Sequence, residues 1–257
     1  MQASRSRPKS TQSKFCSSRA NLAIAELLYH NSLITHENSN SMNISKIKIA
    51  KVDDAAQVPQ VMNENGVEWN TIGCCNWPEE FPYKPKAEFR VAYIDDAFLV
   101  HYRASEDSVR AKYVEDDGDV WTDSCMEMFL SPCPEDGSYY NLECNCIGTV
   151  LLGYHDADGN KSRAAYDVTA GISRWASLGR SPFVEREAEG PWEVALIVPF
   201  ACYWRHAFRP EAGTQMRGNF YKCGDELRTP HFLSWAPIEW ERPNFHLPQF
   251  FGQLRCQ

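Results

Sequence analysis

The sequence predicts an all-β fold, an antiparallel β-sandwich of the jelly-roll type with few short helices. In several short segments, apolar and polar residues alternate with a period of two, and Gly, Pro, Asp or Asn bounds each segment. No regular alternation of strands with long amphipathic helices is visible, and the 14 Gly and 15 Pro suit a chain with many turns. With 257 residues, 43% of them hydrophobic, the chain is long enough to bury one sizeable core.

The expected strands follow from the alternation of side chains. In the first of them, Phe89, Val91 and Tyr93 alternate with more polar neighbours, and a turn at Asp95–Asp96 precedes the next. The segments with this pattern are residues 89–93, 98–102, 126–130, 140–146 and 192–198. We expect each strand to pack one face on the core and to expose the other to water. Short helices are expected at residues 54–64 and 199–208.

Residues 42–257 are predicted to form a single β-sandwich domain. Residues 1–41 are expected to be a disordered arm or to precede the true start, because residues 1–20 have no acidic residue and too few apolar groups to offset chain entropy. Met42 opens an orderly segment and is the favoured start. No clean signal peptide is visible, so we expect a cytoplasmic location in which the ten cysteines stay reduced.

Composition excludes several classes of partner. The net charge of −8 argues against general nucleic-acid binding, and no apolar run is long enough to span a membrane. Cys144 and Cys146 share one face of a strand, but no second pair has zinc-ligand spacing, so we expect core thiols and no metal centre or other cofactor. Eight tryptophans provide aromatic surface for stacking or for the core.

The acidic block at residues 115–130 contains the first candidate site. Trp121 lies among five acidic residues, where an indole is costly unless it stacks on something, although a solvated acidic loop is the simpler interpretation. Glu127 falls on the strand face opposite Met126 and Met128. We expect it to point away from the core as an ionised carboxylate that accepts hydrogen bonds from hydroxyl groups.

A second row of polar side chains follows at residues 139–148. Asn141, Glu143 and Asn145 lie on one face of the predicted strand, about 6.6 Å apart. Carboxylates and amides at this spacing suit the donors and acceptors of sugar hydroxyls, and ordinary cross-strand polar pairing is the alternative.

The C-terminal run, residues 217–252, is dense in aromatic and turn-forming residues. Trp235 and Trp240 are candidate stacking platforms in this run. His231 and His246 are additional polar candidates, although a single histidine more often has a structural role.

These blocks together resemble the family 9 carbohydrate-binding modules, in particular the stand-alone bacterial proteins of family 9-like type. The resemblance covers residues 70–252. It rests on Trp121, Glu127 and Phe129 in W-x5-E-x-F, followed by YYNLECNCIG, WEVALIVPF and RGNFYKCGD…HFLSWAPI…PNFHLPQFFG. It implies a β-sandwich that clamps a sugar ring between two tryptophans, with charged and amide side chains that read the hydroxyls.

The resemblance assigns roles to individual residues. Trp121 matches the first clamp tryptophan, Glu127 the hydroxyl-reading carboxylate, and Trp235 the second clamp tryptophan, for which Trp240 is the substitute. The usual Asp-Ser-Val-Glu of the family reads Asp-Ser-Cys-Met-Glu here, which leaves the role of Asp123 open. Some members bind structural calcium. The candidate oxygens in this chain are those of Asp156, Asp158 and Asn160, in a segment that also reads as a hairpin turn.

The expected function is non-catalytic binding of a mono- or oligosaccharide, including the ends of plant polysaccharides, in carbohydrate catabolism. One alternative is an O-glycosyl hydrolase that pairs Glu127 with Glu143 or Asp123. Others are a protein-interaction module with a degenerate sugar site and a haem-binding sandwich, which would need axial His or Met ligands.

Overall fold

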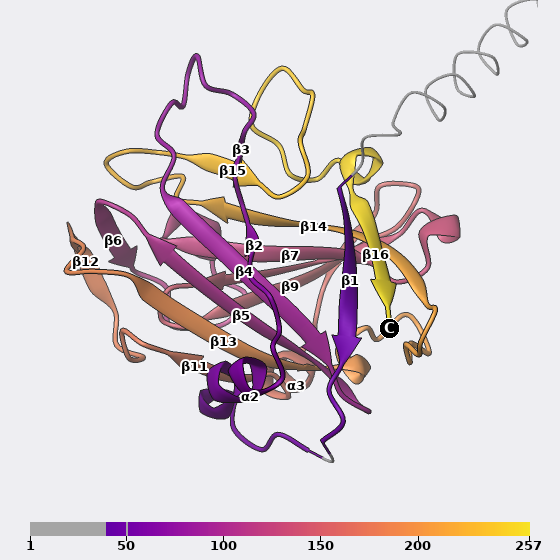
Figure 1. The fold of residues 1–257 in the computed structure, drawn as a ribbon. Coiled ribbons are helices and arrows are strands. Elements are labelled where there is room, and N and C mark those ends of the chain that lie inside the picture. The colour runs from indigo at the N-terminus through magenta and orange to yellow at the C-terminus, as the bar shows by residue number, and fades with distance from the viewer. Residues whose placement is uncertain (1–39, 50) are drawn as a thin grey trace, which may run out of the picture. The chain divides into compact units, whose positions relative to one another are not determined.

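Strand β1 (Ser41–Lys46) joins two β-sheets, because its first residues pair with β16 (Gly252–Cys256) and its last two with β4 (Lys86–Tyr93). The computed structural model describes residues 40–49 and 51–257, which belong to one compact unit, and the expectations for residues 1–39 lie outside the described residues. Both pairings of β1 are parallel, whereas the other strand pairs in the described part of the chain are antiparallel. The predicted β-sandwich is confirmed (Figure 1).

The first sheet carries the candidate site. In spatial order its strands are β10 (Lys161–Arg163), β9 (Val150–His155), β8 (Tyr139–Asn145), β7 (Cys125–Ser131), β14 (Gln215–Cys223), β16 and β1. The end of β14 also pairs with β15 (Phe232–Ser234), which pairs in turn with β3 (Cys74–Cys75).

The second sheet packs against the first. Its strands are β1, β4, β5 (Ala97–Ser105), β13 (Trp192–Pro199) and β11 (Ser173–Ala176), with β2 (Asn70–Thr71) beside the start of β4. A separate pair is formed by β6 (Ser108–Ala111) and β12 (Phe183–Glu187). All five predicted strands are confirmed, as β4, β5, β7, β8 and β13.

Helices are short. The prediction for residues 54–64 is confirmed by the 3-10 turn η1 (Ala55–Gln57), which the Asp54 carboxylate caps, and by α2 (Val58–Glu64). The prediction for 199–208 is mostly wrong, since only η4 (Phe200–Cys202) is helical there. The remaining helical segments are η2 (Val120–Thr122), η3 (Pro134–Asp136), α3 (Tyr166–Ala170) and η5 (Pro248–Phe250). None of the described helices has the length and apolar character needed to cross a membrane.

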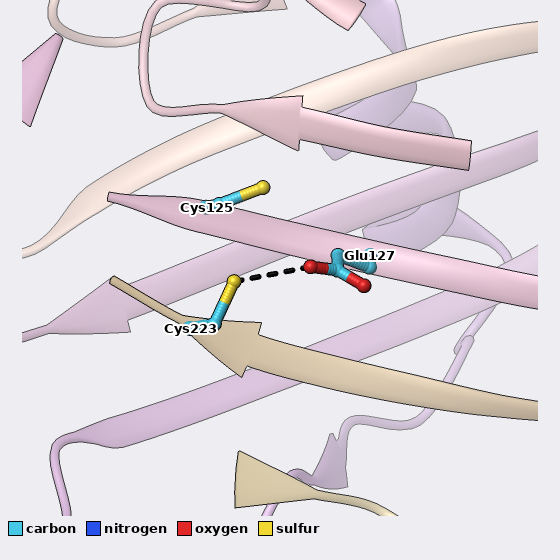
Figure 2. A group of neighbouring side chains, drawn as sticks. All are labelled: Cys125, Glu127 and Cys223. Carbon is cyan, nitrogen blue, oxygen red and sulfur yellow. Dashed lines mark hydrogen bonds between the residues drawn. The ribbon is translucent and has the colours of Figure 1, made fainter. Parts of the chain in front are cut away.

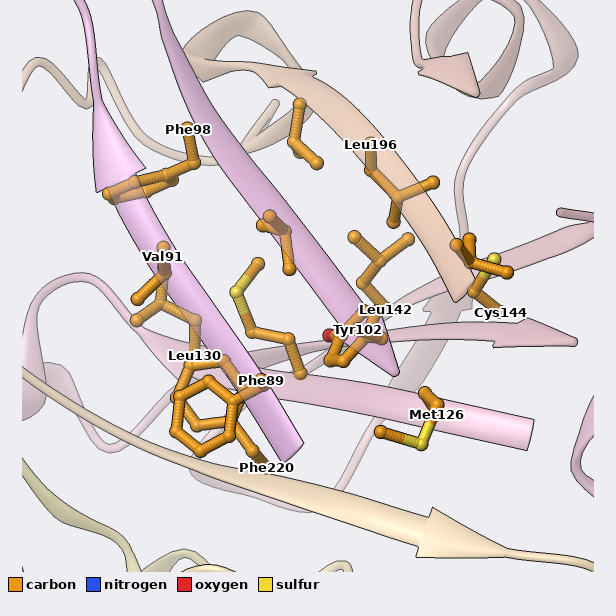
Figure 3. Packing of buried hydrophobic residues seen from close by; sticks show 14 of the residues in the cluster. Phe89, Val91, Phe98, Tyr102, Met126, Leu130, Leu142, Cys144, Leu196 and Phe220 are labelled. Carbon is orange, nitrogen blue, oxygen red and sulfur yellow. The ribbon is translucent and has the colours of Figure 1, made fainter. Parts of the chain in front are cut away.

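The main core fills the space between the two sheets (Figure 3). Phe89 of β4 stacks on Phe220 of β14 with ring centroids 3.6 Å apart, which locks the layers together at this point. Met126 of β7 and Leu142 and Cys144 of β8 point into the same core, as the alternation predicted.

The expected water-exposed face is wrong for β7 and β8. Every residue of both strands is buried. The face opposite the main core lies under a second group of apolar residues, which we call the outer cluster. It includes Tyr139, Tyr221, Phe245, Leu247 and Phe251. The C-terminal segment supplies three of these, so aromatic loops rather than water cover this side of the sheet.

Candidate functional site

A cavity of about 450 Å³ lies on the outer face of the first sheet. Its floor is made by side chains of β7, β8, β9 and the end of β14, and β10 and the loop after β15 form its rim. The residues used below are Trp121, Glu127, Phe129, Asn141, Glu143, Gly153, His155, Ser162, Arg163, Cys223, Asp225, Phe232, Asn244, Phe245 and His246.

Strand register brings the floor residues together. Glu127 of β7 pairs directly with Glu143 of β8, and Phe129 pairs with Asn141. On the other side of β8, Asn141 pairs with Gly153 of β9. Because side chains alternate between faces, all of these positions point to the outer side of the sheet. Glu127 and two members of the predicted row, Asn141 and Glu143, are thus brought into one cavity.

Burial changes the chemistry of the two facing carboxyls. Glu127 is only 2% exposed, and burial together with the neighbouring Glu143 raises its pKa well above the ordinary value. Burial also raises the pKa of Glu143 to about 7, against the opposing effect of its hydrogen bond with Asn141. The expectation that Glu127 points away from the main core is confirmed, but its exposure to water is wrong, and burial favours its protonated form. Burial favours the protonated form of both carboxyls, and a protonated carboxyl can donate as well as accept a hydrogen bond.

Several polar atoms of the cavity have no protein partner among the described residues. The Asn141 amide donates to Glu143 Oε1 at 2.8 Å, which leaves Asn141 Oδ1 and Glu143 Oε2 buried and unpaired. Ser162 Oγ, at the rim, is also buried and has no hydrogen-bond partner. A buried polar atom without a partner costs free energy in the folded chain, so such atoms mark a place where a ligand or water completes the hydrogen bonding.

Aromatic groups and neutral imidazoles form the walls. Tyr139 stacks on His155 with centroids 4.6 Å apart, and His155 stacks in turn on His246. Burial lowers the pKa of His155 to about 4, so this ring is neutral at physiological pH. Phe232 and Phe245 line the same cavity, which therefore offers flat apolar surface beside its polar floor.

Trp121 lies in η2 and is half-buried against the outer cluster while it lines the cavity. Two buried side chains hold this segment. Asp123 Oδ2 accepts hydrogen bonds from the backbone N–H groups of Lys112 and Tyr113 and from the Asn145 amide at 3.0 Å. Asp123 therefore has a structural role. Asn145, predicted to contact ligand, does not line the cavity, because its own hydrogen bonds also tie down the turn after β8.

The two late tryptophans do not face Trp121 across the cavity. Trp235 is 7% exposed and packs edge-on against Phe89 and Phe220 in the main core. Its predicted role as the second clamp ring is wrong, because Trp235, which directly follows β15, points into the main core on the opposite face of the sheet. Trp240 is 52% exposed and is not among the cavity-lining residues, although Asn244 farther along the same loop is.

The structure adds cavity residues to which the sequence reasoning gave no role in ligand binding. Phe129 shares the face of Glu127 two residues away, so the period of the strand carried enough information to find it. His155 lies on β9, which pairs with β8, and Arg163 lies on β10, which pairs with β9, and neither pairing has a clear signal in the sequence. Asp156, in the turn between these strands, accepts hydrogen bonds from the N–H groups of Asp158 and Asn160, which confirms the hairpin-turn reading of this segment.

Comparisons with known proteins agree with this architecture. The family model described as Carbohydrate-binding family 9 matches residues 56–256, which is most of the chain. The chain belongs to this family. A family 9 module from Caldicellulosiruptor kristjanssonii, solved in complex with glucose, has a TM-score of 0.50 at 14% identity, covers 85% of this chain and 96% of that one, and shares the fold.

A second solved structure is more similar to this family 9 chain. It is a protein of Bacteroides uniformis ATCC 8492 that is provisionally described as carbohydrate-binding. The two sequences are 41% identical, the TM-score is 0.82, and the match covers 85% of this chain and all of the other. A comparison with curated proteins found no match.

Proposed function

We propose that this family 9 chain binds a mono- or oligosaccharide, without cleaving it, in the cavity on the outer face of the first sheet. The observation that carries the proposal is the combination of buried, unpaired Asn141 Oδ1 and Glu143 Oε2 with aromatic walls in a cavity of about 450 Å³. That volume is in the range of small-ligand sites, roughly 300–1,000 Å³.

The two kinds of surface match the two sides of a sugar ring. The C–H face of a pyranose is apolar and stacks on an aromatic ring, for which Trp121 is the candidate in this cavity. The hydroxyl edge needs both donors and acceptors. Asn141 and Glu143 offer unpaired acceptor atoms, and Glu127, with its raised pKa, offers a carboxyl proton. One ring buries little area, so we expect Kd values of about 10⁻⁶ to 10⁻³ M.

The glucose complex of the Caldicellulosiruptor module supports a glucose-type ring as the first ligand to examine. By extension, we propose that the chain takes ends of plant polysaccharides and their soluble fragments, and that it serves carbohydrate catabolism.

The arrangement of the carboxyls favours binding over hydrolysis. Glycoside cleavage needs two carboxyl groups that flank the scissile bond. Glu127 and Glu143 are neighbours on the floor of one sheet, so they approach a bound ring from the same side. The third carboxylate of the alternative, Asp123, is held by the backbone of residues 112 and 113.

The test is a titration of the purified chain with glucose, xylose, cellobiose and cellotriose. Binding is measured by calorimetry and by tryptophan fluorescence. We expect at least one sugar to bind, with a loss of roughly tenfold or more in Glu143→Gln and in Trp121→Ala, because each removes a contact made only at this site. Trp240→Ala is the matched control and is expected to bind as the wild type does.

Two results would contradict sugar binding at this site. One is the absence of binding to every sugar of the panel. The other is a fluorescence response that survives in Trp121→Ala and disappears in Trp240→Ala, since the site would then lie in the exposed part of the C-terminal loop. Release of sugar from an aryl glycoside by the wild type, lost in Glu143→Gln, would replace binding by hydrolysis.

A further inference from the structure

Two thiols and a carboxyl from neighbouring strands lie close together (Figure 2), and two of these three groups line the cavity. Cys125 of β7 and Cys223 of β14 are directly paired across the two strands, and Glu127 lies two residues beyond Cys125 on the same face. One ligand atom from each of the three side chains lies within 4.8 Å of the others. The Cys223 thiol donates to Glu127 Oε1 at 3.0 Å.

This spacing is close to what a tetrahedral metal ion requires. With metal–sulfur bonds of about 2.3 Å and metal–oxygen bonds of about 2.0 Å, neighbouring ligand atoms lie roughly 3.5–3.8 Å apart. Small side-chain rotations would bring the two sulfurs and one carboxylate oxygen to that separation. The two strands are fixed by a continuous ladder from Arg217 to Cys223, so the backbone already holds the ligands in place.

Acidic groups gather near the two thiols, whereas the cations that line the cavity, Lys161 and Arg163, lie on β10 at its rim. Glu143 and Asp225 line the cavity beside Glu127. The nearest ammonium in sequence, that of Lys222, points to the opposite face and pairs with Glu106 at 2.8 Å. The buried carboxyls of Glu127 and Glu143 and the half-buried carboxyl of Asp225 therefore line the same cavity, and a divalent cation would compensate their charge.

A metal ion can reach this group of side chains from the cavity. Glu127 and Cys223 both line the cavity, whereas Cys125 is closed off behind them. We propose that Cys125, Glu127 and Cys223 form a binding site for a thiophilic divalent cation such as Zn²⁺, with a fourth position open to the cavity. Both thiols, and the Glu127 carboxyl where it is protonated, release their protons to solvent when the metal binds, and no electron is transferred. A water molecule or a ligand hydroxyl fills the fourth position.

A second cluster in the described part of the chain provides a contrast. Cys133, Asp136 and His206 are also close enough to share a metal ion. Both ring nitrogens of His206 are already engaged, Nε2 with Asp136 at 2.8 Å and Nδ1 with the Tyr140 hydroxyl at 2.9 Å. The cluster at residues 125, 127 and 223 has thiols as its majority ligands, so it is the better site for a soft metal.

The experiment is a titration of the reduced full-length chain with Co²⁺, monitored by absorbance, and then with Zn²⁺. We expect one Co²⁺ per chain with a thiolate-to-cobalt charge-transfer band and the intense visible bands of tetrahedral cobalt, both of which Zn²⁺ abolishes. The band is expected to weaken in Cys125→Ala and Cys223→Ala, and the affinity to fall at least tenfold in Glu127→Gln. Cys144→Ala, which removes a buried thiol from the core face of β8, is the matched control.

Three results would overturn the proposal: Co²⁺ binding without a charge-transfer band, no binding at all, or a band that is unchanged in Cys125→Ala and Cys223→Ala but lost in Cys133→Ala. Circular dichroism of each variant establishes that the fold is retained, and the paired Cys144→Ala variant reports the effect of losing a core thiol. No sugar takes part in this titration, so its failure leaves the proposed carbohydrate binding intact, and the reverse also holds.

Discussion

The two faces of strand β8 are equally buried but have different roles. On the inner face, Leu142 and Cys144 pack among apolar residues of both sheets. On the outer face, Asn141 and Glu143 lie over a cavity and keep unpaired polar atoms. Burial alone therefore does not separate core from site in this protein. The separating property is whether each buried group has a partner within the chain.

The difference has a thermodynamic side. Each inner side chain removes apolar area from water and stabilises the fold by about 25 cal/mol per Å². The outer face works against folding, because desolvated carboxyls and unpaired acceptors are costly until a ligand satisfies them. Variants on adjacent residues of the same strand should consequently affect stability in one case and binding in the other.

The largest expected effect follows truncation of the inner face. Leu142→Ala removes a buried side chain between the two sheets and should lower the free energy of unfolding by about 2–5 kcal/mol, as cavity-forming substitutions do. The folded fraction should bind sugar with nearly wild-type affinity. Urea denaturation and calorimetry on the same sample measure the two quantities. A loss of affinity as large as that of Glu143→Gln would mean that the two faces are not separable.

A smaller effect is expected from adding one methyl group to the outer face. A Cβ at Gly153 would lie 2.3 Å from Asn141 Oδ1, so Gly153→Ala must displace the amide from its place on the cavity floor. We expect sugar affinity to fall roughly tenfold, which corresponds to about 1.4 kcal/mol, with a smaller change in stability. Calorimetry with the sugar that binds best measures the change.

The control for this variant is Gly190→Ala, where an added Cβ meets nothing within 4 Å. It should leave both affinity and stability within experimental error. If Gly153→Ala also binds as the wild type does, the position of Asn141 is unimportant for ligand and the hydroxyl-reading role of the floor is wrong.

The contrast between the faces was partly predictable from the sequence. A period of two placed Glu127, Asn141 and Glu143 on the face opposite the methionines and leucines, and the register of β7 with β8 then brought them together. The same rule placed Asn145 with them. It could not reveal that the amide of Asn145 is used by Asp123, because that contact depends on the path of a loop.

The other features of the site could not be predicted from the sequence, because they depend on packing between segments far apart in the chain. Trp235 and Phe245 both lie in the aromatic C-terminal run, yet one packs in the main core and the other lines the cavity. Composition does not distinguish an aromatic residue of the core from one that lines a cavity. Only the pairing of β15 with β14 decides which way Trp235 points. The expected wet face of β7 and β8 was wrong for the same reason, since the covering loops come from the distant end of the chain.

The smallest effect concerns pH and again distinguishes the faces. The folded chain keeps His155 neutral, with its pKa lowered to about 4 by burial, whereas an unfolded histidine has a pKa of about 6.5. Between these values the unfolded state binds a proton that the folded state does not, so the free energy of unfolding falls as pH falls through this window. From pH 7 to pH 6 the contribution of His155 is about 0.7 kcal/mol.

His155→Phe keeps an aromatic ring in the stack with Tyr139 and removes the titration. Urea denaturation at both pH values should show a decrease in stability that is smaller than that of the wild type by about this amount. Leu142→Ala, in contrast, should lower stability equally at pH 7 and pH 6, because no ionisable group is changed on the inner face. An equal pH dependence in His155→Phe and the wild type would mean that the outer cluster does not keep this imidazole from water in the folded chain.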